Sequence, residues 1–330
     1  MKKALFVYYI KTLVFVLYNK LIFFANFDMI ENISLPKVSA LGTVKMKREH
    51  EIEMIKKRIK MIGLDCDGTL LNDKKELTPY SKEVLCKAID QGIVVLAATG
   101  RPLSGIPKEV KELTGIRYAL TANGARIVDM KENKVIYEAT MSIETAIRIL
   151  EVFEKYDTYK EAFIGETGFT DAEDLKHVEE YGLIPSMVQY LRESRVPVAD
   201  VVEKLRDKKK PVDKVQALFK NIEEKEKAFL EIRKIKGTEP TGALHNNIEV
   251  NAAGVNKGLG LLKLGELLGI SREEIMACGD GMNDLEMLKE AGFGVAVANA
   301  VQPVKDVADY VTESNEEDGV ANAIVKFALV

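Results

Sequence analysis

Residues 64–71 read Leu64-Asp65-Cys66-Asp67-Gly68-Thr69-Leu70-Leu71, and this stretch decides how the rest of the chain is interpreted. It follows an apolar run over 58–64 that predicts a strand, and its glycine predicts a turn at the end of that strand. Residues i and i+2 of a strand point to the same side, so Asp65 and Asp67 can converge on one point. Two neighbouring carboxylates repel each other, which costs free energy unless a cation or a proton offsets the repulsion or catalysis requires the pair. Surface turns use the same residue types, so the interpretation needs support from elsewhere in the chain.

The composition is that of an ordinary globular protein. A length of 330 residues predicts about two domains, and an apolar fraction of 47% with a charged fraction of 30% allows a real core. A net charge of −4 over this length argues against a general nucleic-acid binder. The three cysteines, Cys66, Cys86 and Cys278, lack the spacing of a disulfide framework or a metal site, which favours a reduced, cytoplasmic protein.

The first residues need separate treatment. Residues 1–27 are rich in Phe, Leu, Ile, Val and Tyr, but Lys11 and Lys20 interrupt the apolar run, whereas a membrane-spanning helix needs about 20 apolar residues. Three interpretations remain: an atypical membrane anchor, a disordered leader, or sequence upstream of a true start at Met54 or Met46. We favour a dispensable or untranslated leader and exclude residues 1–53 from the predicted fold.

From residue 58 onward, short apolar runs alternate with helical patterns, which predicts strand–helix–strand units around a parallel sheet, as in a Rossmann-like α/β core. Thr78-Pro79 is typical of a helix start, and Gly92 closes that helix. Further core strands are expected over 93–98, as a pair within 118–128, and over 275–278 and 293–297. Further core helices are expected over 257–268, 283–290 and 304–310, with a capping box at 271–274.

The middle of the chain predicts a second α/β domain. Helices are expected over 142–156 and 199–208, and alternating strands over 161–170, 214–220 and 242–251. No glycine fingerprint or nucleophile motif occurs there. We therefore predict a core made of 54–138 and 242–330, with an inserted α/β cap over 139–241, and these bounds are good to a few residues.

Four polar clusters carry the candidate chemistry. Three follow apolar strands, at 65–69, 99–102 and 279–284, and the fourth, Asn256-Lys257-Gly258, opens a helix. Ligands of open α/β sheets bind beyond the carboxyl ends of the strands, so the clusters should meet in space. Carboxylates that converge with a lysine indicate Mg²⁺ and an anion. The Thr99 hydroxyl and the free amides of the Gly68 turn could cradle phosphate oxygens.

Each cluster also has a structural interpretation. Thr99-Gly100 could be a simple turn and Gly279-Asp280-Gly281 a hairpin turn, although a strand before the latter and a helix after it favour a strand-to-helix corner. Lys257 could be an ordinary surface residue, although a cation at a helix start opposes the helix dipole and favours a nearby anion. An EF-hand is excluded because the glycine after Asp65 falls at the fourth position of the loop. No Gly-x-Gly-x-x-Gly follows a strand, so a dinucleotide site is unsupported.

Together the clusters resemble the motifs of the haloacid dehalogenase-like hydrolases. The motifs are Asp65-Cys66-Asp67-Gly68-Thr69-Leu70-Leu71, Ala98-Thr99-Gly100-Arg101-Pro102, Asn256-Lys257-Gly258 and Gly279-Asp280-Gly281-Met282-Asn283-Asp284. Within that family the chain is similar to the Cof-type phosphatases of subclass IIB, whose α/β cap is inserted between the second and third motifs. About 160 residues separate Thr99 from Lys257, which leaves room for such a domain. Cys66 departs from the usual aliphatic residue, and its side chain should point away from the aspartates.

The resemblance implies covalent catalysis. Asp65 would attack phosphorus and form an aspartyl-phosphate, while Asp67 would protonate the leaving oxygen and then deprotonate the attacking water. Mg²⁺ would be held by the Asp65 carboxylate, the Asp67 backbone carbonyl and Asp280.

The resemblance also implies the groups around the phosphate. Thr99 and Lys257 would hold the phosphoryl group, and Asn283 would lie near it. Asp284 would act as an orienting group outside the metal's direct ligands. Asn123, in Ala122-Asn123-Gly124-Ala125, is expected to face the site.

The leading hypothesis is a magnesium-dependent phosphatase of small phosphorylated metabolites, with sugar phosphates as the best candidates. Alternatives are a phosphotransferase of the same architecture, or a non-catalytic sugar-phosphate sensor, which would be membrane-attached if residues 1–27 form an anchor. Binding alone does not need both Asp65 and Asp67, which favours an enzyme. Substrate contacts are expected from the cap, at Glu166 or in His245-Asn246-Asn247, although His245 could equally be a surface residue.

Overall fold

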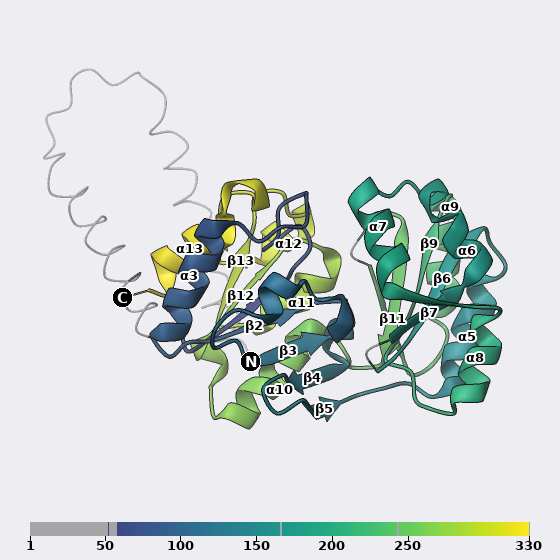
Figure 1. The fold of residues 1–330 in the computed structure, drawn as a ribbon, viewed down its shortest axis with the longest axis horizontal. Coiled ribbons are helices and arrows are strands. Elements are labelled where there is room, and N and C mark those ends of the chain that lie inside the picture. Colours follow the sequence, from purple (N-terminus) through teal and green to yellow (C-terminus); the bar gives the residue numbers. More distant parts are fainter. Residues whose placement is uncertain (1–51, 53–57, 166, 243, 330) are drawn as a thin grey trace, which may run out of the picture. The chain divides into compact units, whose positions relative to one another are not determined.

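The computed structural model describes residue 52 and residues 58–329, apart from 166 and 243, and the larger of its two sheets forms the core. This eight-stranded sheet has the order β14 (Tyr310–Val311), β13 (Phe293–Ala296), β12 (Ile275–Gly279), β1 (Met61–Leu64), β2 (Val94–Ala98), β3 (Tyr118–Thr121), β4 (Arg126–Asp129) and β5 (Lys134–Glu138) (Figure 1). The pairings are parallel from β14 to β3, whereas β4 and β5 are antiparallel additions. The predicted parallel α/β core is confirmed.

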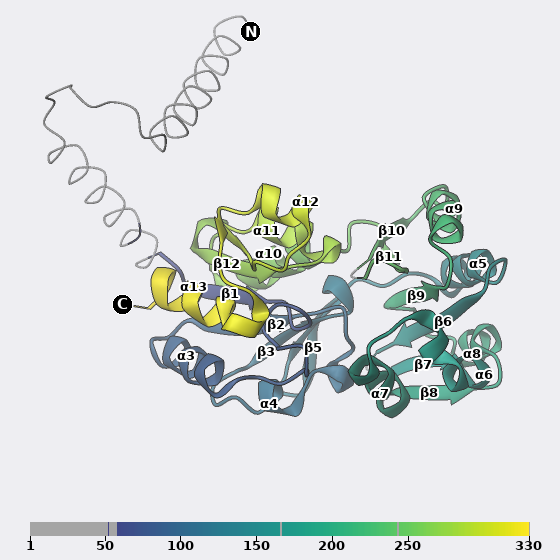
Figure 2. The same ribbon diagram turned by 90° about the horizontal axis from the view of Figure 1, so that it is seen from above.

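Helices cover both faces of the core sheet, which is why β1 and β12 are buried at every position. On one face α3 (Pro79–Asp90) packs against α13 (Gly319–Phe327), and on the other α10 (Lys257–Leu268) packs against α11 (Leu285–Glu290) (Figure 2). The shorter helical elements are α4 (Lys108–Lys111), α12 (Gln302–Val307), η1 (Leu103–Gly105), η2 (Ala122–Gly124), η4 (Arg272–Glu274), η5 (Met282–Asp284) and η6 (Asn315–Glu317).

The inserted segment forms a second sheet. Its six strands have the order β10 (Thr238–Thr241), β11 (Asn247–Ala252), β9 (Lys214–Phe219), β6 (Thr158–Ile164), β7 (Thr167–Asp171) and β8 (Arg195–Val198). All pairings are antiparallel except that of β7 with β8. The accompanying helices are α5 (Ile143–Phe153), α6 (Ala172–Lys176), η3 (Val178–Tyr181), α7 (Pro185–Ser194), α8 (Val201–Lys208) and α9 (Ile222–Ile232).

The two faces of the cap sheet differ in chemistry. Val215, Ala217 and Phe219 alternate along β9 and join one apolar cluster with residues of α5, α8 and α9. Lys214 and Gln216 occupy the opposite face of the same strand, because successive side chains of a strand point to opposite sides. The other face is mixed, because Leu218 on the same strand joins a second, smaller apolar cluster with Tyr159 and residues of η3 and α7.

The signals at helix ends are confirmed. Thr78 caps α3 by accepting a hydrogen bond from the Ser81 backbone N–H at 3.0 Å, and Pro79 occupies the first helical position. Asn256 caps α10 in the same way through the Leu259 N–H at 2.9 Å. The N-terminus of α10 is thereby fixed at the residue that the third motif predicts.

Several predicted elements differ from the structure. The helix expected over 304–310 ends at Val307, because the chain turns into β14 and joins the sheet edge. The strand expected over 161–170 is the hairpin of β6 and β7, which reverses at Gly165. The prediction did not include α4, β5, α6, α7, β8, α9, β10, β14 and α13, several of which are short.

The boundary between core and cap stays a prediction, and the strand pairing favours a later position for it. The strand expected over 242–251 corresponds to β11, which pairs with β9 and β10 in the cap sheet. The predicted return to the core at residue 242 therefore falls between two strands of the cap sheet. We propose a later boundary, after Ala252.

The predicted leader, 1–53, lies outside the described residues except for residue 52. Within the part of the chain that the structure describes, no helix combines the length and the apolar character needed to cross a bilayer.

Gly124→Ala is expected to destabilise the core more than Gly254→Ala. Both glycines have left-handed backbone angles, with φ of 99° and 73°, which cost other residues about 1–2 kcal/mol. A Cβ at Gly124 would also lie 2.4 Å from the Asn256 carbonyl oxygen, whereas nothing lies within 4 Å of a Cβ at Gly254. Overpacking adds about 1–3 kcal/mol. Urea unfolding of both variants measures the difference, and equal losses would contradict the close approach.

Candidate active site

Four segments bring polar side chains together at the carboxyl edge of the core sheet. Asp65 follows β1, Thr99 follows β2, and Asp280 follows β12. Lys257 is the first residue of α10, whose N-terminus faces this edge because its ammonium group contacts the residue after β1. The expectation that the four clusters meet is confirmed.

Lys257 joins two carboxylates. Its Nζ donates hydrogen bonds to Asp65 Oδ1 at 2.5 Å and to Asp284 Oδ1 at 2.6 Å. Burial lowers the pKa of Lys257, but the two carboxylates outweigh burial and raise it. The lysine is therefore a permanent cation against Asp65, which is itself only 6% exposed.

Three carboxylates form a group that could hold a metal ion. Asp65, Asp280 and Asp284 offer oxygens that all lie within 4.8 Å of one another. Burial and the Asp284 carboxylate raise the pKa of Asp65 well above its ordinary value, and they raise the pKa of Asp280 to about 7. Lys257 supplies one positive charge to three carboxylates, so negative charge is in excess. Hard oxygen donors with excess negative charge fit Mg²⁺.

Neighbouring donors fix the orientation of this group. Asp284 Oδ2 accepts hydrogen bonds from the backbone N–H groups of Asp280 and Gly281, each at 2.9 Å. Asp280 Oδ1 accepts a hydrogen bond from the Thr69 hydroxyl at 2.5 Å. Because the lysine occupies its other oxygen, Asp284 has both oxygens engaged, which supports the predicted orienting role.

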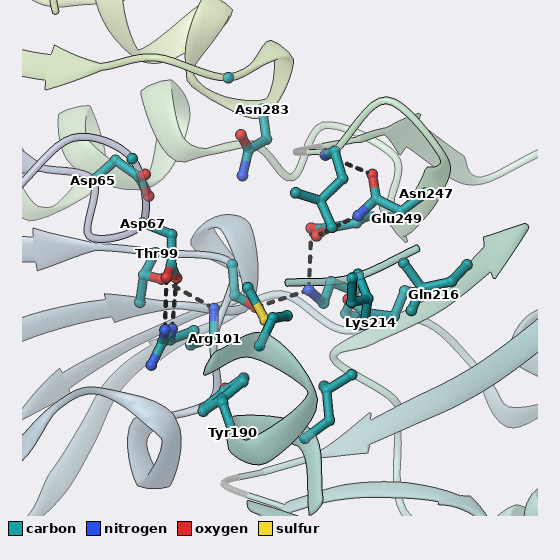
Figure 3. Close-up of a pocket in the computed structure, with 18 of the residues that line it drawn as sticks. Asp65, Asp67, Thr99, Arg101, Tyr190, Lys214, Gln216, Asn247, Glu249 and Asn283 are labelled. Atoms are coloured by element: carbon teal, nitrogen blue, oxygen red, sulfur yellow. Dashed lines mark hydrogen bonds and ion pairs between the residues drawn. The ribbon is translucent and has the colours of Figure 1, made fainter. Parts of the chain in front are cut away.

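Asp67 points toward two cations instead of toward this group (Figure 3). Its carboxylate accepts hydrogen bonds from Arg101 Nε and Nη2, both at 2.6 Å, and lies 2.9 Å from Lys75 Nζ. Burial raises the pKa of Asp67, but Arg101 and Lys75 outweigh burial and hold the pKa below its usual range. The side chains of Asp65 and Asp67 thus do not share one cluster, and Asp284 supplies the third carboxylate. The predicted metal contact of Asp67, through its backbone carbonyl, stays a prediction.

A cavity of about 210 Å³ lies in front of these residues (Figure 3). From the core it is lined by six of the predicted site residues, Asp65, Asp67, Gly68, Thr99, Asp280 and Asn283. From the cap it is lined by residues of α7, β8, β9 and β11, with the polar side chains of Tyr190, Arg195, Lys214, Gln216, Asn247 and Glu249. The Thr99 hydroxyl accepts a hydrogen bond from the Arg101 N–H at 3.1 Å and can donate its own hydrogen to a ligand.

The other three predicted site residues, Lys257, Asp284 and Asn123, do not line this cavity. Asn123 Oδ1 accepts a hydrogen bond from Asn283 Nδ2 at 3.2 Å, and Asn123 Nδ2 donates one to Glu249 Oε2 at 2.5 Å. Asn123 therefore positions a residue that lines the cavity and does not face it directly. A phosphate contact from Lys257 stays a prediction.

Sequence reasoning assigned no role to several residues of the site. Arg101 belongs to the second motif, directly after Thr99-Gly100. That position was the sequence feature that could have indicated a role for Arg101 in the site. Lys214 and Glu249 lie in predicted strands, and the alternation of polar and apolar residues over 247–251 marks a polar face. A polar face of a strand is normally exposed to solvent. The sequence pattern therefore could not predict that this face is buried against a cavity.

The expected substrate contacts in the cap divide into three outcomes. Asn247 lines the cavity, as predicted. His245 lies outside this cavity, and its carbonyl oxygen accepts a hydrogen bond from Lys225 Nζ at 2.7 Å. Glu166 lies outside the described residues. Cys66 is fully buried in the core cluster, as expected for a side chain directed away from the aspartates, and burial raises the pKa of its thiol to about 12.

Comparisons with known proteins agree with this geometry. A family model described as haloacid dehalogenase-like hydrolase matches residues 62–324. The 5-amino-6-(5-phospho-D-ribitylamino)uracil phosphatase YcsE of Bacillus subtilis is 33% identical over 271 residues, which cover 82% of this chain and 96% of YcsE.

Solved structures match over the same region. A haloacid dehalogenase-like hydrolase from B. subtilis has a TM-score of 0.74 at 29% identity, covering 81% of this chain and 99% of that one. The subclass IIB sugar phosphatase BT4131 has a TM-score of 0.69 at 26% identity, covering 82% of this chain and all of that one (100%). Three of its motifs line one cavity, and the third motif contacts them through Lys257; the chain belongs to the haloacid dehalogenase-like hydrolases, as a Cof-type phosphatase of subclass IIB.

Proposed function

We propose that this phosphatase hydrolyses sugar phosphates and related small phosphorylated metabolites in a magnesium-dependent reaction through an aspartyl-phosphate on Asp65. The observation that carries the proposal is the position of Asp65 at the cavity wall. There it contacts Lys257 and lies within the three-carboxylate group that fits a metal ion. An anionic nucleophile can meet an anionic phosphate only where cations offset the repulsion.

In the first step an Asp65 oxygen attacks phosphorus, and the bond from phosphorus to the leaving oxygen breaks. Lys257 holds the attacking carboxylate in place through Oδ1. The Thr99 hydroxyl and the backbone N–H at Gly68 would donate hydrogen bonds to the phosphoryl oxygens, because both residues lie in the cavity wall. Asp67 would supply the proton that the leaving oxygen needs.

In the second step water attacks phosphorus, Asp67 takes a proton from that water, and phosphate leaves with Asp65 restored. In the structure Asp67 is ionised by Arg101 and Lys75, which is the form that a base requires. A phosphate dianion in the cavity would compete for the same two cations. That competition would release Asp67 to bind the proton that it donates in the first step.

Magnesium would be held by Asp65, Asp280 and the Asp67 backbone carbonyl, with Asp284 orienting the group. When bound, it supplies a Lewis acid that offsets charge between nucleophile and phosphate and stabilises the transition state.

Asp280→Asn is expected to stabilise the metal-free protein and to abolish its stabilisation by magnesium. The substitution removes one of three mutually repelling carboxylates, whose repulsion contributes to the raised pKa of Asp280. Magnesium at about 100 times its Kd should add about 2.7 kcal/mol to the unfolding free energy of the unsubstituted protein. Thermal unfolding in chelator and in magnesium measures both effects, with the exposed Asp306→Asn as the control. An equal magnesium shift in Asp280→Asn would remove Asp280 from the metal site.

Relatives and the cavity together support the proposed substrate class. YcsE is named for a ribityl phosphate, and BT4131 for sugar phosphates. The cavity of this chain combines phosphate-binding residues on one wall with polar cap residues on the other. Phosphate release from a panel of phosphorylated metabolites, with and without chelator, tests the proposal. Turnover that persists in chelator would contradict it.

A further inference from the structure

The cap sheet presents a row of polar side chains to the cavity. Gln216 on β9 pairs directly with Glu161 on β6 and with Glu249 on β11, so the three lie side by side on one face. Lys214, two residues before Gln216, shares that face. Gln216, Glu249 and Lys214 line the cavity. Polar groups on the wall of a largely apolar cavity are the groups that fix a ligand's orientation.

One part of the row is satisfied within the cap. Glu161 accepts hydrogen bonds from Arg195 Nε at 2.5 Å, from the Tyr159 hydroxyl at 2.7 Å and from Gln216 Nε2. Arg195 also lies over the Tyr190 ring, 4.9 Å from its centre. These groups satisfy one another within the cap, as expected of a structural buried ion pair, although Arg195, Tyr190 and Gln216 also line the cavity.

Lys214 and Glu249 form a second buried pair, which reaches across to the core. Lys214 Nζ donates hydrogen bonds to the Gly100 carbonyl oxygen at 2.8 Å and to Glu249 Oε2 at 3.1 Å (Figure 3). Lys214 also makes a cation–π contact, which is weak because Nζ lies 4.8 Å from the centre of the Phe163 ring. Burial lowers the pKa of Lys214 despite the attraction of Glu249, so the ammonium group is incompletely compensated.

Glu249 connects this lysine to the catalytic side of the cavity. Its Oε2 accepts the hydrogen bond from Asn123, which in turn positions Asn283, and its Oε1 accepts one from Asn247 Nδ2 at 3.2 Å. A Cβ at Gly100 would lie 3.1 Å from Glu249 Oε2. Glu249 is therefore close to Gly100, the residue that follows Thr99. A ligand that touches Glu249 would therefore also lie next to the phosphate-binding loop.

We propose that Lys214 and Glu249 are the specificity-determining pair of this enzyme and bind hydroxyl groups on the carbons next to the phosphorylated carbon. A hydroxyl group both donates and accepts a hydrogen bond, so an ammonium group beside a carboxylate can satisfy both functions of a neighbouring diol. The pair would distinguish polyol and sugar phosphates from alkyl and aryl phosphates. This inference rests on the proposed phosphatase function.

The test compares two esters that differ only in their hydroxyl groups, ribitol 5-phosphate and n-pentyl phosphate, with p-nitrophenyl phosphate as a third substrate. The unsubstituted protein should prefer ribitol 5-phosphate in kcat/KM. Lys214→Met and Glu249→Gln should each lower the ratio of ribitol 5-phosphate to pentyl phosphate by about 10- to 100-fold, the scale of a hydrogen bond to a charged group. Lys220→Met is the matched control, because this lysine follows the same strand and pairs with Asp157 and Glu180 outside the cavity.

The ratio separates recognition from structure. A purely structural pair would lower turnover of both esters equally and leave the ratio unchanged, which would overturn the proposal, as would an unsubstituted protein with no preference. Glu249→Gln keeps the shape of the side chain and one acceptor oxygen. If Lys214→Met does not fold, the ratio measured for Glu249→Gln therefore tests whether the pair recognises the hydroxyl groups. Turnover of p-nitrophenyl phosphate with an unchanged ratio defeats this inference alone. No turnover of any ester with magnesium defeats the proposed function, and this inference with it.

Discussion

Asp65→Asn should abolish phosphate release in the presence of magnesium while leaving the fold intact. An amide cannot form the aspartyl-phosphate, and removal of a covalent nucleophile costs about 10⁶-fold in kcat. The fold should persist because Lys257 keeps its second partner, Asp284, at 2.6 Å. Single-turnover phosphate release measures the loss, and mass spectrometry of acid-quenched protein should find a phosphorylated peptide containing residue 65 only in the unsubstituted chain.

The exposed Asp73→Asn, in the loop that follows the motif, is the matched control, since it makes the same chemical change outside the cavity. Its turnover should equal that of the unsubstituted protein. Normal turnover by Asp65→Asn, or a phosphorylated peptide that lacks residue 65, would remove Asp65 as the nucleophile.

Asp67→Asn should lower kcat by about 10²–10⁴-fold, the usual contribution of a general acid and base. The loss should depend on the leaving group. An alkyl phosphate needs a proton on its leaving oxygen, whereas p-nitrophenolate leaves without one. With p-nitrophenyl phosphate the first step should therefore remain fast, and the phosphorylated Asp65 should accumulate because water attack lacks its base.

Rapid-quench kinetics with both esters tests this prediction. The magnesium-induced stabilisation should survive in Asp67→Asn, because the predicted metal contact is the backbone carbonyl. The substitution also breaks ion pairs with Arg101 and Lys75, which could disturb the site by itself. That disturbance would slow both esters alike, so equal losses would contradict an acid–base role.

The structural features that the sequence predicts correctly are those set by residues close together in the chain. The strand before Asp65, the helix cap at Thr78 and the start of α10 at Lys257 are confirmed, because each depends on a few neighbouring residues and on the periodicity of one element. Elements that prediction missed, such as α7 and β8, bury few of their own residues, and those contacts depend on neighbours in the cap.

The candidate site was predictable only as far as its motifs. Asp280 and Asn283 line the cavity as expected, but the sequence showed no sign that Arg101 would hold the Asp67 carboxylate. An ion pair between residues 34 positions apart depends on how two loops fold over the sheet edge. Lys214 and Glu249 are further examples, since their partners lie in both domains.

The sequence by itself determined that two aspartates follow the first core strand, that three further motifs follow in order, and that a second domain separates them. Tertiary structure alone decided which carboxylates share a site: Asp65 joins Asp280 and Asp284, whereas Asp67 pairs with Arg101. The physical reason is that the alternation of side chains along a strand fixes which residues share a face of the sheet. Which groups lie opposite that face depends on the packing of helices, loops and cap. In the cap sheet, the polar residues Lys214, Gln216 and Glu249 meet the catalytic cavity instead of water.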